Sequence, residues 1–293
     1  GGSVAGGEYN VAIGSYSLDA LTSGDYNVAV GYNSGTAINS GEAHTLVGNE
    51  AGRKITTSAH NTCIGYFAGG ELTTGATNIA IGSLALDGCD TESNNVAIGF
   101  AALGGAVAGG EYNVAVGNYT LDALTSGDQT TALGHNAATR LTTGNFCTYL
   151  GSEAGVQVTT GNHNVGIGYQ SGGSEATSTG SENTTLGNYA GFGITSGSSN
   201  TIIGYDCAHN ISTGDYNIAI GLDAGTSGSP GGNITTGSSI IALGDENIGA
   251  CHIQTDWTVA SDQRDKTDFT ALDVGLDFIN DLKPYTYKWD KRS

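Results

Sequence analysis

The side chains that could bind a ligand recur at fixed distances from a repeated glycine. Six residues before that glycine stands an acid in these copies: Glu8, Asp25, Glu42, Glu111, Asp128 and Asp215. If the repeats stack at about 4.8 Å, the carboxylates of Glu8, Asp25 and Glu42 repel one another unless a cation bridges them or water solvates them. Two interpretations stay open, a calcium site and solvated charges that prevent lateral sheet addition. We favour the second.

Tyrosines form a second set of candidate binding residues. Directly after the repeated glycine stand Tyr32, Tyr66, Tyr169 and Tyr205. Exposed tyrosines stack on sugars and are common at recognition surfaces, so these rows are candidate contacts for a glycan. The alternative is that stacked aromatic rings stabilise corners of the fold without binding anything, and we favour it. Residues 226–231, which include Pro230, interrupt the repeat and are predicted to protrude as a loop.

Other catalytic and metal-binding patterns are missing from the sequence. The 6 His and 5 Cys show no metal-ligand spacing. The glycine-rich segments lack the lysine of a phosphate-binding loop, and no Ser-His-Asp set can be assembled from motifs. We therefore expect neither a metal nor a cofactor.

Composition narrows the possible partners. The chain has 293 residues, with 49 Gly, 2 Pro, no Met and a formal net charge of -19. This acidity opposes binding to nucleic acid or to anionic lipid, which attract clusters of Lys and Arg. No run of 18 apolar residues is present, so we expect no membrane insertion. Collagen is excluded because Gly does not occupy every third position.

The elements that must position these side chains follow from an internal repeat. The segment Asn10-Val11-Ala12-Ile13-Gly14 recurs in fourteen recognisable copies, mostly 17 residues apart. Their glycines are Gly14, Gly31, Gly48, Gly65, Gly82, Gly99, Gly117, Gly134, Gly151, Gly168, Gly187, Gly204, Gly221 and Gly244.

Each copy predicts one coil of a β-solenoid. Ile, Val or Leu precedes the glycine, Val, Thr or Ile stands three residues before it, and Ala usually lies between them. This alternation indicates a strand, and the glycine marks the corner that follows. A second glycine, seven residues earlier in most copies, marks another corner. We predict an all-β fold with about 17 residues and two short strands per coil, and a rod of roughly 65 Å.

A coil this short encloses little volume, so we expect the rod to be an oligomer. Two aliphatic rows can hardly offset about 1–2 kcal/mol of backbone entropy per ordered residue. The rows of Ala and Asn would let another backbone approach closely, which predicts parallel rods, most simply three. The alternative is a monomeric solenoid whose small residues fit a narrow bore.

The repeat over residues 7–248 resembles the head of YadA-type trimeric autotransporter adhesins, in which Asn-x-Ala-Ile-Gly also repeats. The resemblance implies a left-handed parallel β-roll that forms a homotrimer. Here the coil is longer than in that family, so we expect longer turns.

The sequence changes character near its end, which divides it into a repetitive domain at 1–249 and a second domain at 250–293. Leu272, Leu276, Ile279 and Leu282 recur at helical spacing before Pro284, so a small α+β segment is expected here. The stretch from Ser261 to Lys266 reads Ser-Asp-Gln-Arg-Asp-Lys, and Leu-Lys-Pro-Tyr-Thr-Tyr-Lys-Trp follows at 282–289.

This second domain resembles the start of the intramolecular chaperone of phage tail fibres and tailspikes. The resemblance implies that the domain assembles a trimer and then removes itself. Ser261 would attack the carbonyl of Ala260, with Lys266 as general base once its pKa is lowered. The alternative is that Ser261 caps a turn and Lys266 pairs with surface carboxylates. At most, the chain is a single-turnover protease acting on itself.

Together, the resemblances imply a structural tail-fibre protein of a phage virion, assembled in the host cytoplasm as a homotrimer. Its partners would be other tail proteins and a glycan or protein receptor on the host surface, contacted by Tyr32, Tyr66, Tyr169, Tyr205 and the loop at Pro230. A bacterial trimeric surface adhesin is the main alternative, and a monomeric ice-binding or carbohydrate-degrading solenoid is another.

Overall fold

The computed structural model describes residues 6–105, 109–173 and 175–252. Each repeat contributes one strand of three residues that ends directly before the repeated glycine. The strands are β1 (Val11–Ile13), β2 (Val28–Val30), β3 (Thr45–Val47), β4 (Thr62–Ile64), β5 (Ile79–Ile81), β6 (Val96–Ile98), β7 (Val114–Val116), β8 (Thr131–Leu133), β9 (Thr148–Leu150), β10 (Val165–Ile167), β11 (Thr184–Leu186), β12 (Thr201–Ile203), β13 (Ile218–Ile220) and β14 (Ile241–Leu243).

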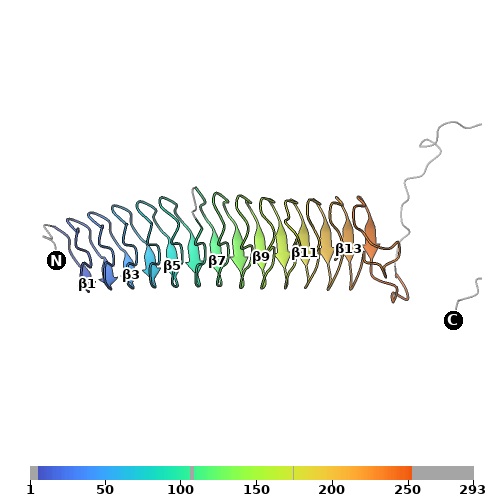
Figure 1. Cartoon of the computed structure of the whole chain (residues 1–293), viewed down its shortest axis with the longest axis horizontal. Helices are drawn as coiled ribbons and strands as arrows, with labels where there is room; N and C mark the ends of the chain where they lie inside the picture. Colours follow the sequence, from blue (N-terminus) through green and yellow to red (C-terminus); the bar gives the residue numbers. More distant parts are fainter. Residues whose placement is uncertain (1–5, 106–108, 174, 253–293) are drawn as a thin grey trace, which may run out of the picture. The chain divides into compact units, whose positions relative to one another are not determined.

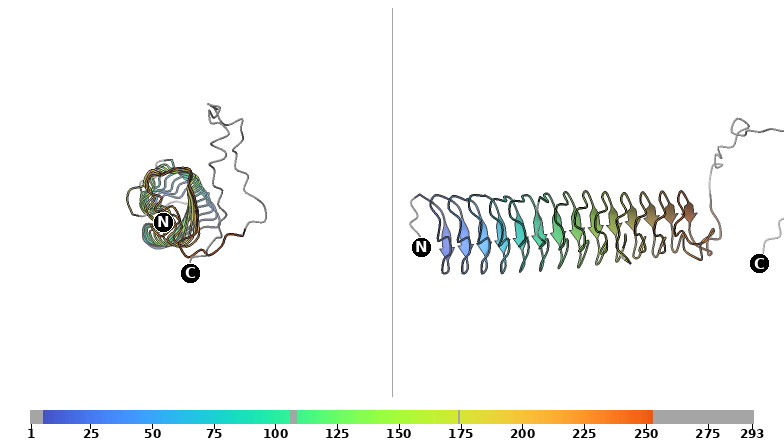
Figure 2. Two further views of the ribbon diagram at one scale, coloured as in Figure 1. Left: turned by 90° about the vertical axis from the view of Figure 1, so that its right-hand side faces the viewer. Right: turned by 45° about the horizontal axis from the view of Figure 1, so that its top comes forward.

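The strands form one parallel sheet in which each pairs with its sequence neighbours, from β1 to β14. Equivalent residues face each other along the sheet, for example Ala80 with Ala97. The predicted β-solenoid of about 17 residues per coil is therefore confirmed (Figures 1 and 2). Thirteen steps of about 4.8 Å give this unit a length of about 60 Å. It comprises Gly1–Ile248, and Gly249–Ser293 form a second unit.

The prediction of two strands per coil is wrong, because the rest of each coil consists of turns within the described residues. The physical reason is a regular interruption of the extended backbone. In most coils, non-glycine residues adopt left-handed backbone angles both five residues before and two residues after the repeated glycine, for example Tyr26 and Asn33 around Gly31. A strand cannot continue through such residues.

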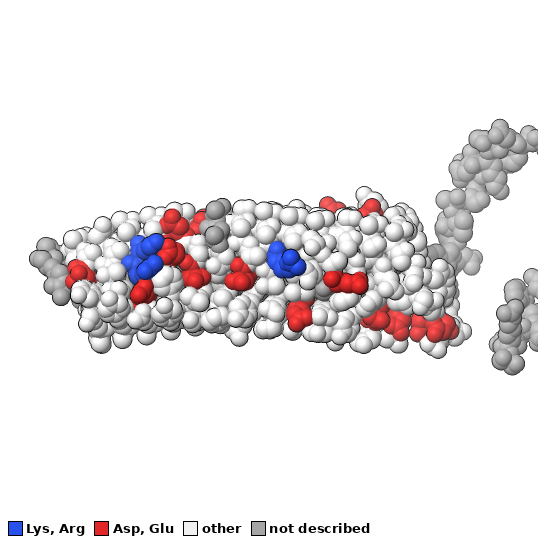
Figure 3. Space-filling view, viewed as in Figure 1, with Lys and Arg blue, Asp and Glu red and all other residues white. Residues whose placement is uncertain are grey.

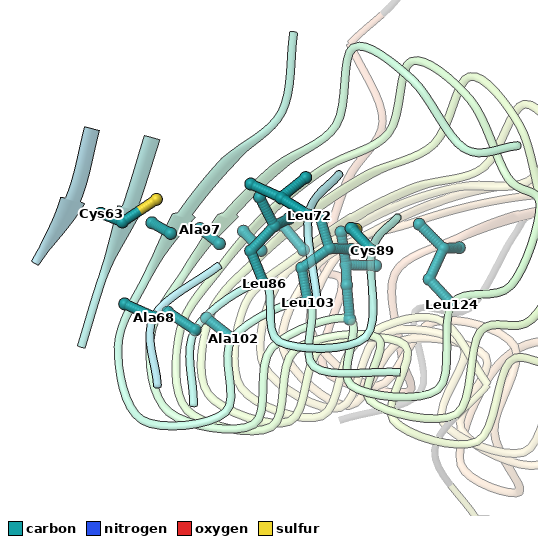
Figure 4. Packing of buried hydrophobic residues seen from close by; sticks show 14 of the residues in the cluster. Cys63, Ala68, Leu72, Leu86, Cys89, Ala97, Ala102, Leu103 and Leu124 are labelled. Carbon is teal, nitrogen blue, oxygen red and sulfur yellow. The ribbon is translucent and has the colours of Figure 1, made fainter. Parts of the chain in front are cut away.

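The solenoid interior is filled by small strand residues and by a column of larger ones. The middle residue of nearly every strand is buried, and Figure 4 shows Cys63 and Ala97 pointing toward the leucines of the lumen. Seven residues after the repeated glycine lies a buried aliphatic residue in most coils, such as Leu21, Ile38 and Leu72. This column supplies much of the core, and the sequence analysis missed it.

The sizes of interior residues compensate one another between neighbouring positions. Ala80 and Ala97 occupy strands whose coils carry the buried Leu86 and Leu103 four residues after the glycine. Leu46 is larger, and its coil carries Gly52 at that position. A Cβ on Gly52 would lie 2.8 Å from a methyl group of Leu46. In these coils, a larger strand residue is accommodated by a smaller residue at the facing position.

A buried ladder of asparagines joins successive coils. The Asn27 amide nitrogen donates to the Gly41 carbonyl at 2.9 Å, and its Oδ1 accepts from the backbone nitrogen of His44 at 3.1 Å. The same pair of bonds recurs at most Asn positions of this column, which lies four residues before the repeated glycine. Each asparagine therefore satisfies two backbone groups that a closed coil would otherwise bury without partners.

His44 replaces asparagine in this ladder and predicts a pH effect. Its Nε2 lies 2.9 Å from the Ser58 carbonyl, and its Nδ1 accepts from the Asn61 backbone nitrogen. The neutral ring fits these partners, and burial lowers its pKa below the usual 6.5. Below about pH 6.5 the unfolded chain therefore binds a proton at His44 that the folded chain does not bind. The free energy of unfolding then decreases as the pH falls, by at most about 1.4 kcal/mol per pH unit.

We expect His44→Asn to flatten this dependence, measured by urea denaturation between pH 7.5 and 5. Substituting the exposed His60 in the same way provides the control, because it leaves the ladder intact. An unchanged pH profile for His44→Asn would contradict the assignment.

Candidate interaction surfaces

The outer face of the sheet carries aliphatic side chains along the whole solenoid. The residue directly before each repeated glycine points outward and is apolar in every coil, and several are well exposed, including Ile13 at 59% and Leu133 at 48%. The row consists of Ile13, Val30, Val47, Ile64, Ile81, Ile98, Val116, Leu133, Leu150, Ile167, Leu186, Ile203, Ile220 and Leu243. We call it the aliphatic stripe.

The expectation that rows of Ala and Asn form the contact face is wrong. Ala29, Ala97 and Asn27 are fully buried inside their own coil. The reason is the size of the lumen: a coil of about 17 residues is narrow, so the middle position of most strands holds a small residue and the large residues on either side of it face outward. The small residues fit a narrow bore, and the apolar surface that remains is the aliphatic stripe.

Charged residues are sparse on the solenoid. Among the described residues the bases are Arg53, Lys54 and Arg140. Figure 3 shows basic side chains in two places and acids scattered along the length of the unit. Arg53 pairs with Glu50 at 3.0 Å and with Glu71 at 2.8 Å. The aliphatic stripe itself contains no charged residue, so its energetics are those of apolar burial.

The acidic column six residues before the repeated glycine has a structural role that neither interpretation of the sequence foresaw. Asp25 Oδ1 accepts from the backbone nitrogen of Glu8 at 2.7 Å, and Asp128 repeats the arrangement with Glu111 at 2.7 Å. Asn and Ser take the same part in other coils. The described residues contain no group of three His, Cys, Asp or Glu placed to hold a metal ion. The hydrogen bonds of this column join equivalent positions of neighbouring coils, so they can be recognised only when the alignment of one coil on the next is known.

The four candidate tyrosines are all exposed, but they do not form a single site. Tyr169 and Tyr205 each pack edge-on against Tyr189, with ring centroids 5.4 and 6.1 Å away. Tyr32 contacts Tyr16, and Tyr66 contacts Phe67.

Phe192 and His209 extend the cluster around Tyr189 and stack at 4.8 Å. The aromatic rings that could stack on a flat face of a ligand are therefore concentrated in the three coils that contain β10, β11 and β12. The sequence analysis missed Tyr189, Phe192 and His209 because none of them lies directly after the repeated glycine.

The insert at 226–231 forms a set of turns. Pro230 is exposed, as expected of a loop residue, but the neighbouring Ser229 is buried and its hydroxyl donates to the Gly244 carbonyl at 3.0 Å. The insert is thus tied to the next coil. Asp223, Glu246 and His209 line an open pocket beside it. Burial and the carboxylates of Asp206, Asp245 and Glu246 raise the pKa of Asp223.

The predicted cleavage residues Ala260, Ser261 and Lys266 lie outside the described residues, as does the expected α+β segment. Within the described part of the chain, no helix is long and apolar enough to span a bilayer. Residues 261–293 match the peptidase S74 family, which is described as the chaperone of endosialidase. The chain matches no curated protein and no solved structure.

The family match begins at Ser261, the residue at which the sequence analysis placed the start of the chaperone motif. The chain therefore combines a parallel β-solenoid with a C-terminal segment similar to an intramolecular chaperone. The last strand ends at Leu243, and the match starts 18 residues later at Ser261.

Proposed function

We propose that this chain is the shaft of a phage tail fibre or tailspike, a homotrimeric rod that carries attachment surfaces for the host cell. The C-terminal segment assembles three chains and is then released. The observation that carries the proposal is the aliphatic stripe, which exposes one continuous apolar row in the single chain. The match to the chaperone of endosialidase supports the tail assignment.

The partner that fits the aliphatic stripe is a second copy of the same chain. The stripe is about 60 Å long and has one apolar residue about every 4.8 Å. A partner that covers all of it must be equally long and must repeat with the same spacing, because any other surface would place polar groups against the apolar side chains. A parallel copy in register supplies that surface. Exposed apolar patches of this extent are otherwise rare on soluble monomers.

Three copies close the assembly around an axis parallel to the rods. Each chain then presents its stripe to the centre, while the row three residues before the glycine, a mixture of Val, Thr and Ile, lies beside it. The resemblance to YadA-type heads supports the number three. Cyclic closure also leaves no stripe free for further addition.

The surfaces that would bind the host cell lie away from the trimer axis. The aromatic cluster around Tyr189 and the exposed Tyr32 and Tyr66 present rings to solvent, and Pro230 lies in the insert. Rings of this kind stack on the apolar faces of sugars. We take a host-surface glycan as the first partner to examine.

Immunogold electron microscopy tests the tail assignment. Antibodies against residues 6–248 should label the tails of particles released from cells that carry the gene. Labelling of the bacterial surface in the absence of particles would instead favour the trimeric adhesin and would contradict the proposal.

Release of the chaperone is the enzymatic part of the proposal. The Ser261 hydroxyl attacks the Ala260 carbonyl carbon while Lys266 accepts the hydroxyl proton. The C–N bond between Ala260 and Ser261 then breaks as Lys266 passes that proton to the Ser261 nitrogen, which leaves an ester between the Ala260 carbonyl and the Ser261 oxygen. Water hydrolyses this ester, which frees the Ala260 carboxyl group and restores the Ser261 hydroxyl. We expect mass spectrometry of the gene product to show a break between Ala260 and Ser261. Ser261→Ala and Lys266→Ala should each abolish it, and Ser293→Ala serves as the control. An uncut wild-type product would remove this step and leave the fibre assignment standing.

A further inference from the structure

Tyr149 is unusually large for its position in the lumen of the solenoid. It occupies the middle of β9, where most strands carry Ala, and only 1% of its surface is exposed. Two glycines make the room for its ring. A Cβ on Gly155 would overlap the ring, and a Cβ on Gly166 would lie 2.9 Å from Cδ1. The ring therefore extends from its own coil toward the coil of β10.

The coil of β10 contributes no large apolar side chain to the lumen. Its strand has Gly166 in the middle, and Gly172 follows. Ser178 pairs with Val158 in an isolated bridge, in the column that holds Leu, Ile or Val in most coils. The buried apolar residues accordingly fall into two clusters, of which the first ends at Val158 and the second begins at Ala190.

At this interruption the Tyr149 hydroxyl is buried and makes no hydrogen bond of ordinary geometry to the residues that the structure describes. The polar side chains that interact with it are the Asn164 amide and the Cys147 thiol, and burial raises its pKa well above the usual value. Tyr149 also lines a small space that leaves about 10 Å³ for the centre of a water molecule. It is lined by Tyr149, Val158, Asn164, Val165, Gly172, Ser178, Gly180, Asn183, Thr185 and Ile194. That volume is at the lower limit for one water and is too small for any organic ligand.

The polar groups around the space can accept further hydrogen bonds. The Gly180 carbonyl accepts from the Asn164 amide at 2.8 Å, and Asn164 Oδ1 accepts from the Asn183 backbone nitrogen at 2.9 Å. Each of these two oxygens has a second lone pair. A hydroxyl donor and two acceptors thus lie around a space of the size of one water molecule.

We propose that one water molecule is bound inside the solenoid at this point. It accepts from the Tyr149 hydroxyl and donates to two of the surrounding oxygens. The site replaces the apolar filling that the coil of β10 lacks, and it joins the two apolar clusters through hydrogen bonds. A buried hydroxyl without a partner is unfavourable, and the bound water removes this cost.

The sign of the stability change in Tyr149→Phe tests this site. If the water is bound, the substitution deprives it of a partner, and the thermal midpoint should fall by about 2–4 °C. If the space is empty, the substitution removes an unsatisfied hydroxyl, and the midpoint should stay or rise, which would overturn the proposal. Tyr205→Phe is the matched control, because that hydroxyl is exposed and its loss should leave the midpoint unchanged.

A high-resolution crystal structure of the wild-type protein provides the second measurement. We expect an isolated density peak within hydrogen-bond distance of the Tyr149 hydroxyl oxygen, and the same peak absent in Tyr149→Phe. A well-ordered Tyr149 with no peak beside it would overturn the proposal even if the variant failed to fold.

Discussion

Replacing Gly82 by alanine should unfold the middle of the solenoid. Gly82 follows β5 with φ +136°, a backbone conformation that side chains rarely permit. A Cβ there would overlap the carbonyl oxygen of Gly99 in the next coil and lie 2.7 Å from its carbonyl carbon. Both atoms belong to the backbone, so the coils must separate to make room. We expect a loss of about 3–5 kcal/mol from strain and overpacking together.

Hydrogen exchange followed by mass spectrometry measures this effect where it arises. Because each coil contacts only its neighbours, protection should fall most in β5 and β6 and less toward β1 and β14. Gly231→Ala is the control: its φ is also positive, at +91°, but no atom lies within 4 Å of the added Cβ. It should cost about 1 kcal/mol. Equal effects at both positions would show that coil-to-coil contact is unimportant.

Replacing Ile98 by glutamate should abolish assembly while leaving the coil intact. Ile98 ends β6 in the middle of the aliphatic stripe, and its side chain points away from the lumen. In the proposed trimer, three carboxylates would face one another in an apolar centre, and each buried charge without a partner costs several kcal/mol. We expect the trimer to weaken by at least about a hundredfold, which corresponds to about 3 kcal/mol.

Sedimentation velocity, together with circular dichroism, separates assembly from folding in this variant. Ser126→Glu is the matched control, because Ser126 is exposed, lies in the next coil between β7 and β8, and is outside the stripe. It should remain assembled. A fully assembled Ile98→Glu protein would place the interface elsewhere.

The sequence predicted the coil, its period and its strand because these depend on local residue types. The alternation around Ala97 identifies a strand, and Gly99 identifies the corner that ends it. The alternation of residue types along a strand does not show which of its two faces points into the lumen. Both faces of this strand are apolar, and the usual preference for large residues inside fails here because the narrow lumen holds a small strand residue in most coils.

The binding surfaces were less predictable because they depend on register between coils. Asp25 serves the backbone of Glu8 in the preceding coil, a relation that no single repeat reveals. Tyr189 became part of a cluster because neighbouring coils bring Tyr169 and Tyr205 to either side of it. The small space lined by Tyr149 likewise arises because the next coil has Gly166 in the middle of its strand, where the other strands have larger residues.

The oligomeric mass of the wild-type protein in dilute solution tests the account most directly. Each chain has a mass of 29.5 kDa, and the outward aliphatic stripe predicts particles of three times that mass at nanomolar concentration in mass photometry or sedimentation. Stable particles of one chain, with the stripe open to water, would contradict it.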